Sequence, residues 1–165
     1  MSRGFTFFEL IITLLLISLM VLEVSGRLNS LSPSLKMARL ATELKGFILL
    51  AKSQAIMRQQ SVWIHLEWPE VGPYWQLTLT DSAKLNEGVV ILRLSGKPFS
   101  GLKLKSNYSD NQISFDPFHG RPKNGRLTFY SVQAPQESLQ VRTYYRSAMV
   151  RVCASTEKYL DYETC

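Results

Sequence analysis

The chain has 165 residues, of which 45% are hydrophobic, and its formal net charge is +6. This length suits one small folded domain with an added segment, and the hydrophobic content excludes a fully disordered chain. The positive charge is concentrated between Val89 and Cys153, where ten Lys and Arg residues accompany three acidic residues. Such an excess suits an anionic partner, and solubility alone is the alternative explanation.

The N-terminal stretch joins a short leader to a long apolar segment. Arg3-Gly4 precedes Phe5-Thr6-Phe7-Phe8-Glu9, and an apolar run continues to Leu22. A helix over these 18 residues from Phe5 is about 27 Å long, close to a hydrocarbon core of about 30 Å. We therefore expect a transmembrane segment over about residues 5–25. An acid such as Glu9 within it is costly, so we expect it to have a partner.

This stretch resembles the type III signal of type IV pilins and type II secretion pseudopilins. The resemblance implies that a prepilin peptidase cuts between Gly4 and Phe5 and then methylates the new N-terminal amine of Phe5. It also implies that Glu9 lies on a helix that packs into a filament, where it pairs with the new amine of a neighbouring subunit. The alternative is an ordinary signal anchor in which Glu9 is neutral or reaches toward the membrane surface.

The same resemblance implies a location in the bacterial cell inner membrane. A single-pass subunit would have its N-terminus in the cytoplasm and its C-terminal domain in the periplasm before it joins a filament. The charges that flank the apolar run add little, because one leader Arg gives only a weak positive-inside signal.

Pro33 is expected to kink or interrupt the helix, and a second helical pattern begins at Ser34. Apolar residues then recur at steps of three and four, with charged residues between them. The recurring residues are Leu40, Leu44, Phe47, Ile48, Ala51 and Ala55. The helix is expected to continue to about Gln59, with its apolar stripe packed on a folded domain.

From residue 60 onward the pattern changes to short alternating segments separated by turn residues. Strands are expected over residues 62–68, 75–80, 89–94, 102–105, 112–115, 126–132, 139–145 and 149–153, with residues 69–74 connecting the first two. The predicted fold class is α+β: a long N-terminal helix, with a membrane half and an amphipathic half, packed on an antiparallel β-rich domain. The predicted division is a leader over 1–4, the helix over 5–59 and a periplasmic β domain over 60–165.

The two cysteines, Cys153 and Cys165, lie close to the C-terminus. In an oxidising periplasm they are expected to form one disulfide that fastens the tail, and two free thiols are the alternative. Closing a loop of this size with a disulfide stabilises the folded protein by about 3 kcal/mol in the chain-entropy model.

Two C-terminal segments resemble the FimT and GspH subgroup of minor pilins and minor pseudopilins. They are Phe115-Asp116-Pro117-Phe118-His119-Gly120-Arg121, followed by Gly125-Arg126-Leu127-Thr128-Phe129, and the closing Met149-Val150-Arg151-Val152-Cys153. The resemblance implies a subunit that acts by assembly into a type IV pilus or a type II secretion pseudopilus, and not an enzyme. Its expected partners are prepilin peptidase, other pilin or pseudopilin subunits and the inner membrane.

Some FimT-type proteins bind DNA through a C-terminal Gly-Arg-x-Arg motif. The aligned positions here are Ala148-Met149-Val150-Arg151, so only Arg151 of that motif is present. Other residues nearby could replace the missing charge and stack on bases. The candidate DNA-binding residues are Arg121, Lys123, Arg126, Arg142, Tyr144, Tyr145, Arg146 and Arg151. A DNA-binding minor pilin for uptake in natural transformation is therefore an alternative function, and the plainer alternative makes the tyrosines alternating strand residues, one inward and one outward, beside a solvated basic edge.

The sequence gives no pattern that predicts a cofactor or a metal. His65 and His119 are isolated from other metal-ligating residues, and no phosphate-binding or dinucleotide-binding motif is present. Trp63, Trp68 and Trp75 flank the first expected hairpin, where core or edge packing explains them better than a ligand cage.

Overall fold

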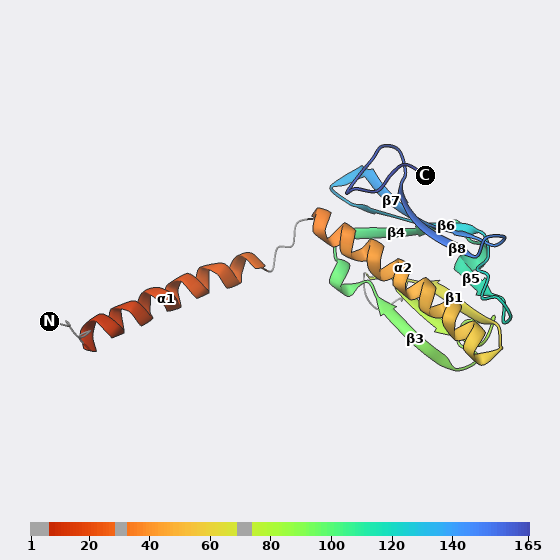
Figure 1. Cartoon of the computed structure of the whole chain (residues 1–165), viewed down its shortest axis with the longest axis horizontal. Coiled ribbons are helices and arrows are strands. Elements are labelled where there is room, and N and C mark those ends of the chain that lie inside the picture. Colours follow the sequence, from red (N-terminus) through yellow and green to blue (C-terminus); the bar gives the residue numbers. More distant parts are fainter. Residues whose placement is uncertain (1–6, 29–32, 69–73) are drawn as a thin grey trace. The chain divides into compact units, whose positions relative to one another are not determined.

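The structure is a computed structural model that describes residues 7–28, 33–68 and 74–165. The chain divides into two compact units, Met1–Ser32 and Pro33–Cys165. The first contains helix α1 (Phe7–Leu28), and the second contains helix α2 (Pro33–Arg58) and all described strands (Figure 1). Gly4 and Phe5, the predicted processing site, lie outside the described residues, as do residues 69–73 of the predicted hairpin connection.

Helix α1 presents bulky apolar side chains on every side. All ten such side chains from Phe7 to Leu19 are exposed, by between 43% and 80%. The hydroxyls of Thr13 and Ser18 donate to the carbonyls of Leu10 and Leu15 at 2.9 and 2.8 Å, so these polar groups are satisfied within the helix. The part of the chain that the structure describes holds no helix whose length and apolarity would let it cross a membrane.

Helix α2 starts at Pro33, where the fixed φ of proline and its missing N–H suit a first helical turn. It ends at Arg58, followed by Gln59 with a positive φ of 50°. The apolar stripe expected from the sequence is buried along this helix. Its buried residues are Met37, Leu40, Ala41, Leu44, Phe47, Ile48, Ala51 and Ala55.

The strands form two antiparallel sheets of four strands each. The first sheet has the order β3-β2-β1-β5, with β1 Val62–Glu67, β2 Gln76–Thr80, β3 Val90–Ser95 and β5 Gln112–Phe115. The second has the order β4-β6-β7-β8, with β4 Leu102–Ser106, β6 Gly125–Ser131, β7 Ala134–Tyr144 and β8 Met149–Ala154. Short 3₁₀ turns, η1 (Lys97–Phe99) and η2 (Ser109–Asn111), precede β4 and β5.

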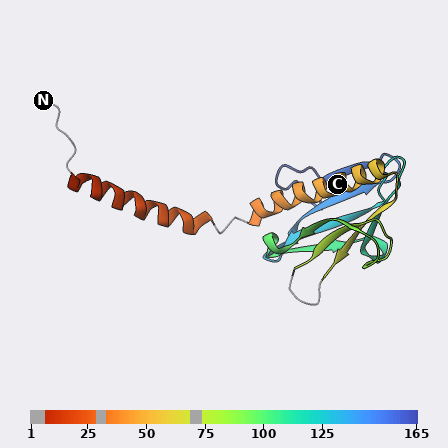
Figure 2. The ribbon, with the colours of Figure 1, turned by 90° about the horizontal axis from the view of Figure 1, so that it is seen from below.

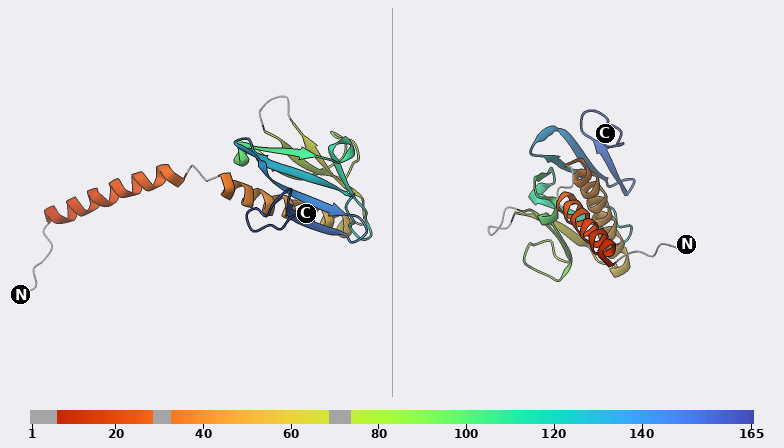
Figure 3. Two further views of the ribbon diagram at one scale, coloured as in Figure 1. Left: turned by 90° about the horizontal axis from the view of Figure 1, so that it is seen from above. Right: turned by 90° about the vertical axis from the view of Figure 1, so that its left-hand side faces the viewer.

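The core lies between α2 and the inner faces of both sheets. Helix α2 contacts β1 and β5 of the first sheet and β6, β7 and β8 of the second. Figures 2 and 3 show both sheets lying on the same side of α2. Phe115, Phe129 and Val141 are among the core side chains that are almost completely buried. The predicted α+β fold class, with a helix packed on an antiparallel β domain, is confirmed.

Strand β7 differs from its prediction, because it begins at Ala134 instead of residue 139. Its first part, with Pro135, pairs with β6 through an irregular register between Tyr130 and Ser131, whereas β8 pairs only from Leu139 onward. A proline is tolerated there because one side of the strand is unpaired.

Candidate functional site

Three cross-strand arginines form a row over the second sheet. Arg126 on β6 lies opposite Arg142 on β7, and Arg142 lies opposite Arg151 on β8. Directly opposed residues project from the same face of a sheet. The residues next to them in register, Leu127 and Val141, are buried in the core, so the row lies on the outer face.

Two lysines of β4 extend this outer face. Lys103 pairs with Tyr130, and Lys105 pairs with Thr128, on the face opposite the buried Leu104. The Lys105 ammonium lies 5.3 Å from the centre of the Tyr130 ring. Five cations from four strands thus share one side of the sheet; we call this surface the basic face. It comprises Lys103, Lys105, Arg126, Arg142 and Arg151.

The basic face costs stability, because like charges placed opposite each other in a sheet repel. Across the described ranges 7–28, 33–68 and 74–165, no carboxylate lies within ion-pair distance of these five cations. Arg142 is held by donating from Nε to Gln140 Oε1 at 3.0 Å. A pocket of about 290 Å³ opens between Arg126 and Arg142, lined also by Asn107, Asn124 and Tyr144. These donors suit an anionic group.

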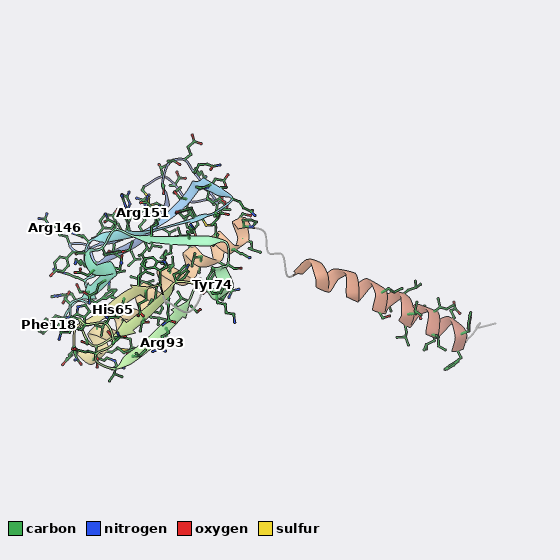
Figure 4. The ribbon with its side chains drawn as sticks, turned by 180° about the vertical axis from the view of Figure 1, so that it is seen from behind. His65, Tyr74, Arg93, Phe118, Arg146 and Arg151 are labelled. Atoms are coloured by element: carbon green, nitrogen blue, oxygen red, sulfur yellow. A yellow bond between two sulfur atoms is a disulfide. The ribbon has the colours of Figure 1, made fainter. Side chains whose placement is uncertain are left out.

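The remaining candidate DNA-binding residues lie at one end of the same sheet, where the turn after β7 meets the loop before β6. The guanidinium of Arg121 lies 5.9 Å from the Tyr145 ring centre, and the backbone N–H of Tyr145 donates to Asn124 Oδ1 at 2.5 Å. Lys123 Nζ donates to Ser109 Oγ at 2.6 Å. Arg146 projects from this end of the unit (Figure 4).

The expectation that Tyr144 and Tyr145 alternate as strand residues, one inward and one outward, is wrong. Strand β7 ends at Tyr144, and Tyr145 lies in the following turn with 45% of its surface exposed. Lys103 and Lys105 were missed as candidates. The alternation Leu102-Lys103-Leu104-Lys105 could have placed both lysines on an outer face, but not beside the arginines.

The C-terminal tail is fastened to the edge of the second sheet. Cys153 in β8 and Cys165 are joined by a disulfide, with Cα atoms 5.1 Å apart. Ala154 N donates to Glu163 O at 2.8 Å, and Cys165 N donates to Ala154 O at 3.0 Å. The tail therefore covers part of an edge strand that would otherwise offer unpaired backbone groups.

The contacts of His65 indicate a structural role. It is buried on β1, with Nε2 2.9 Å from Thr80 Oγ1 and 3.1 Å from Ser82 O. Among the residues that the structure describes, no cluster of three His, Cys, Asp or Glu side chains could hold a metal ion. Glu9 lies in the first turn of α1, where a negative charge complements the helix dipole.

A family model described as type II transport protein GspH matches residues 40–157, which cover most of α2 and all of both sheets. The chain belongs to the GspH family. Two solved structures share the fold of this GspH-type chain. The type IV minor pilin FimU of Pseudomonas aeruginosa is 13% identical, with a TM-score of 0.54 over 70% of this chain and 94% of that one. The minor pseudopilin EpsH of Vibrio cholerae is 14% identical, with a TM-score of 0.50 over 72% and 97%.

No curated protein matches the chain. The predicted membership of the minor pilins and pseudopilins of the GspH/FimT type is confirmed by the family match and by the shared fold. It supports a role in a type IV pilus or a type II secretion system, as a structural subunit. The family match begins at residue 40, so the processing signal rests on the residues around Gly4 alone.

Proposed function

We propose that this GspH-type chain is a minor pilin or pseudopilin that prepilin peptidase processes at Gly4 and Phe5 and that assembles through its N-terminal helix. One observation carries the proposal: a helix with every described bulky apolar side chain exposed precedes a folded domain of the family. A helix that is apolar all round needs lipid or other helices to cover it.

The free energy available from covering α1 is large. Ten bulky apolar side chains between Phe7 and Leu19 are exposed by 43% or more. Burying the exposed part of each is worth about 1 kcal/mol, so full coverage stabilises by on the order of 10 kcal/mol. Because the apolar run of the sequence extends from Phe5 to Leu22, we infer that the inner membrane covers this segment first and that the helices of neighbouring subunits cover it in the filament.

Glu9 is proposed to set the register of assembly. The amine that cleavage creates at Phe5 is positive, and a neighbour's Glu9 can pair with it when helices stack with an axial offset. A charge pair of this kind is acceptable in a low-dielectric environment, whereas one partner without the other is costly.

The Glu9→Ala variant tests this role in cells that hold the whole assembly system. We expect the variant to reach the membrane fraction at the normal level, while its recovery in sheared filaments or in cross-links to other subunits falls at least tenfold. Glu43→Ala is the control, since Glu43 is a partly exposed acid of α2 paired with Arg39 at 2.7 Å. Assembly of Glu9→Ala at the level of Glu43→Ala would show that Glu9 does not set the register.

The basic face favours a second candidate function, a DNA-binding minor pilin for DNA uptake. Arg126, Arg142 and Arg151 present guanidinium groups in one row, without a carboxylate of the described residues to neutralise them. Phosphates can replace that missing charge, and their binding releases counterions from DNA. The broken Gly-Arg-x-Arg motif is therefore compensated by residues on adjacent strands.

Binding of DNA to the full chain in detergent, titrated at low and moderate salt, tests this function. We expect salt-sensitive binding that Arg142→Ala and Arg151→Ala each weaken about three- to tenfold and with a smaller salt dependence. Arg93→Ala, on β3 of the other sheet, is the charge-matched control. No binding at low salt would leave the basic face as a solvated or subunit-docking surface.

A further inference from the structure

A second surface, separate from the basic face, forms where three segments meet at the C-terminal end of α2. The loop before β6 lies against α2, because a Cβ at Gly120 would stand only 2.7 Å from Lys52 Cγ. Lys52 Nζ donates to the carbonyl of Ala148, in the turn after β7, at 3.2 Å. That turn and the loop also meet through Arg121 and Tyr145. We call this the Phe118 surface, made by Ile56, Met57, Phe118, Arg121, Tyr145 and Arg146.

Each of the three segments that meet here exposes a large apolar side chain. Phe118 is 80% exposed and Met57 is 74% exposed, while Tyr145 and Ile56 are 45% and 42% exposed. Figure 4 shows Phe118 and Arg146 projecting from the same end of the unit. A single exposed apolar residue needs no explanation, but several on adjoining segments mark an interaction site.

The loop that carries Phe118 is fastened by hydrogen bonds within itself and by its packing on α2. One carboxylate oxygen of Asp116 accepts hydrogen bonds from the backbone N–H groups of Phe118 and His119. The other oxygen accepts one from the backbone N–H of Arg121, and all three distances are 2.9 Å. Gly120 adopts a left-handed φ of 61° and approaches the α2 backbone closely, which a side chain would prevent. Because the backbone on both sides of Phe118 is held in this way, binding costs little backbone freedom there, so the exposed ring can act as an anchor.

The charge around Phe118 is positive. Residues 53–60, 116–124 and 145–148 contain four cations, Arg58, Arg121, Lys123 and Arg146, and a single acid, Asp116. The Asp116 carboxylate is already engaged by three backbone donors. In the described part of the chain, none of these four cations has a carboxylate within ion-pair distance. A complementary partner is therefore acidic.

We propose that the Phe118 surface docks an acidic protein that receives Phe118 in an apolar pocket and places carboxylates against Arg121 and Arg146. This goes beyond assembly through the N-terminal helix, because it assigns a partner to the folded domain. Two copies of this chain do not pair through this same surface, since such a contact would bring the Arg121 and Arg146 of each copy against like charges.

The proposal is tested with a photo-crosslinking phenylalanine analogue, p-benzoylphenylalanine, placed at position 118 of the full chain in its native cells. The same probe at Trp68, an aromatic residue 51% exposed outside this surface, is the control. We expect one discrete cross-linked protein at position 118, identified by mass spectrometry as a different and acidic chain, and no such product at position 68.

Charge reversal and loop variants sharpen the test. Arg121→Glu with Arg146→Glu should reduce the cross-link at least fivefold, and so should Asp116→Ala, whereas Arg93→Glu should leave it unchanged. No product, a product insensitive to these changes, a second copy of this chain, or a nuclease-sensitive product would each overturn the proposal.

Filament assembly is measured in the same cells. The proposed function and the docking surface can then be tested independently of each other. A cross-link without assembly contradicts the proposed function and leaves the docking surface standing. Assembly without a cross-link contradicts the docking surface and leaves the proposed function standing.

Discussion

At the scale of single residues, a buried tyrosine links the loops at one end of the second sheet. The Tyr108 hydroxyl lies 2.8 Å from Thr143 Oγ1, and the Thr143 hydroxyl donates to the carbonyl of Lys123. Burial raises the pKa of Tyr108 to about 12, and the hydrogen bond with Thr143 opposes that rise only in part. The phenol is therefore neutral at every physiological pH.

Gly125 makes room for this tyrosine, and a Gly125→Ala variant tests the packing. A Cβ at Gly125 would overlap the Tyr108 ring, with Cζ 2.8 Å away. We expect a loss of about 1–3 kcal/mol in the free energy of unfolding, measured by urea denaturation of residues 33–165. Gly46→Ala is the control, because nothing lies within 4 Å of a Cβ there. Alanine within a helix is more stable than glycine by about 0.5–1 kcal/mol, so this variant should not lose stability. Equal stability of the two variants would contradict the packing assigned to Tyr108.

Asp116 makes stability depend on pH. Burial opposes its ionisation, but hydrogen bonds from the N–H groups of His119, Arg121 and Phe118, with the nearby His119 ring, outweigh burial and lower the pKa of the carboxyl. A lowered pKa in the folded state contributes stability that is complete above the usual value of about 4 and is lost as pH falls through the lowered value.

An Asp116→Asn variant should reveal this dependence. At neutral pH we expect it to unfold about 1–2 kcal/mol more easily than the wild type, because the charged acceptor is lost. That difference should shrink as the pH falls below about 4, in urea titrations across a pH series. A difference that stays constant at acidic pH would show that the carboxylate charge does not hold the Phe118 loop.

At the scale of elements, the local patterns predicted the helix α2 and most of the strands. The buried stripe of α2 follows from apolar residues at steps of three and four. The strands follow from alternating apolar and polar residues between turn residues. The pairing of strands could not be predicted from the sequence, because the register joins strands that are distant in the chain. The row of Arg126, Arg142 and Arg151 depends on that register. For the same reason, Phe118 was visible only as part of a family motif.

The tail beyond β8 is an element whose order depends on one covalent bond. Because Cys165 is exposed while Cys153 is buried, Cys165→Ser opens the disulfide without changing the core. We expect a loss of about 2–3 kcal/mol in unfolding free energy and faster hydrogen exchange at the amides of Ala154 and of residue 165. Ser53→Ala, on the exposed side of α2, should change neither quantity. Unchanged exchange in Cys165→Ser would mean that the backbone hydrogen bonds alone hold the tail.

At the scale of the whole molecule, the two units have opposite requirements. The unit from Pro33 to Cys165 buries its apolar stripe and sheet faces in a core of its own, and it belongs to the GspH family. The apolar surface of α1 is exposed and has to be covered by something else. A subunit that waits in a membrane and is then built into a filament satisfies both requirements, and the folded unit is free to present the basic face and the Phe118 surface.

The N-terminus of the mature chain tests the central claim most directly. It can be read by mass spectrometry of the chain purified from cells with and without prepilin peptidase. The account predicts a chain that begins at Phe5 with a methylated amine when the peptidase is present, and an uncut leader when it is absent. A chain that keeps residues 1–4 in cells with active peptidase, or that is cut after the apolar run, would contradict the account.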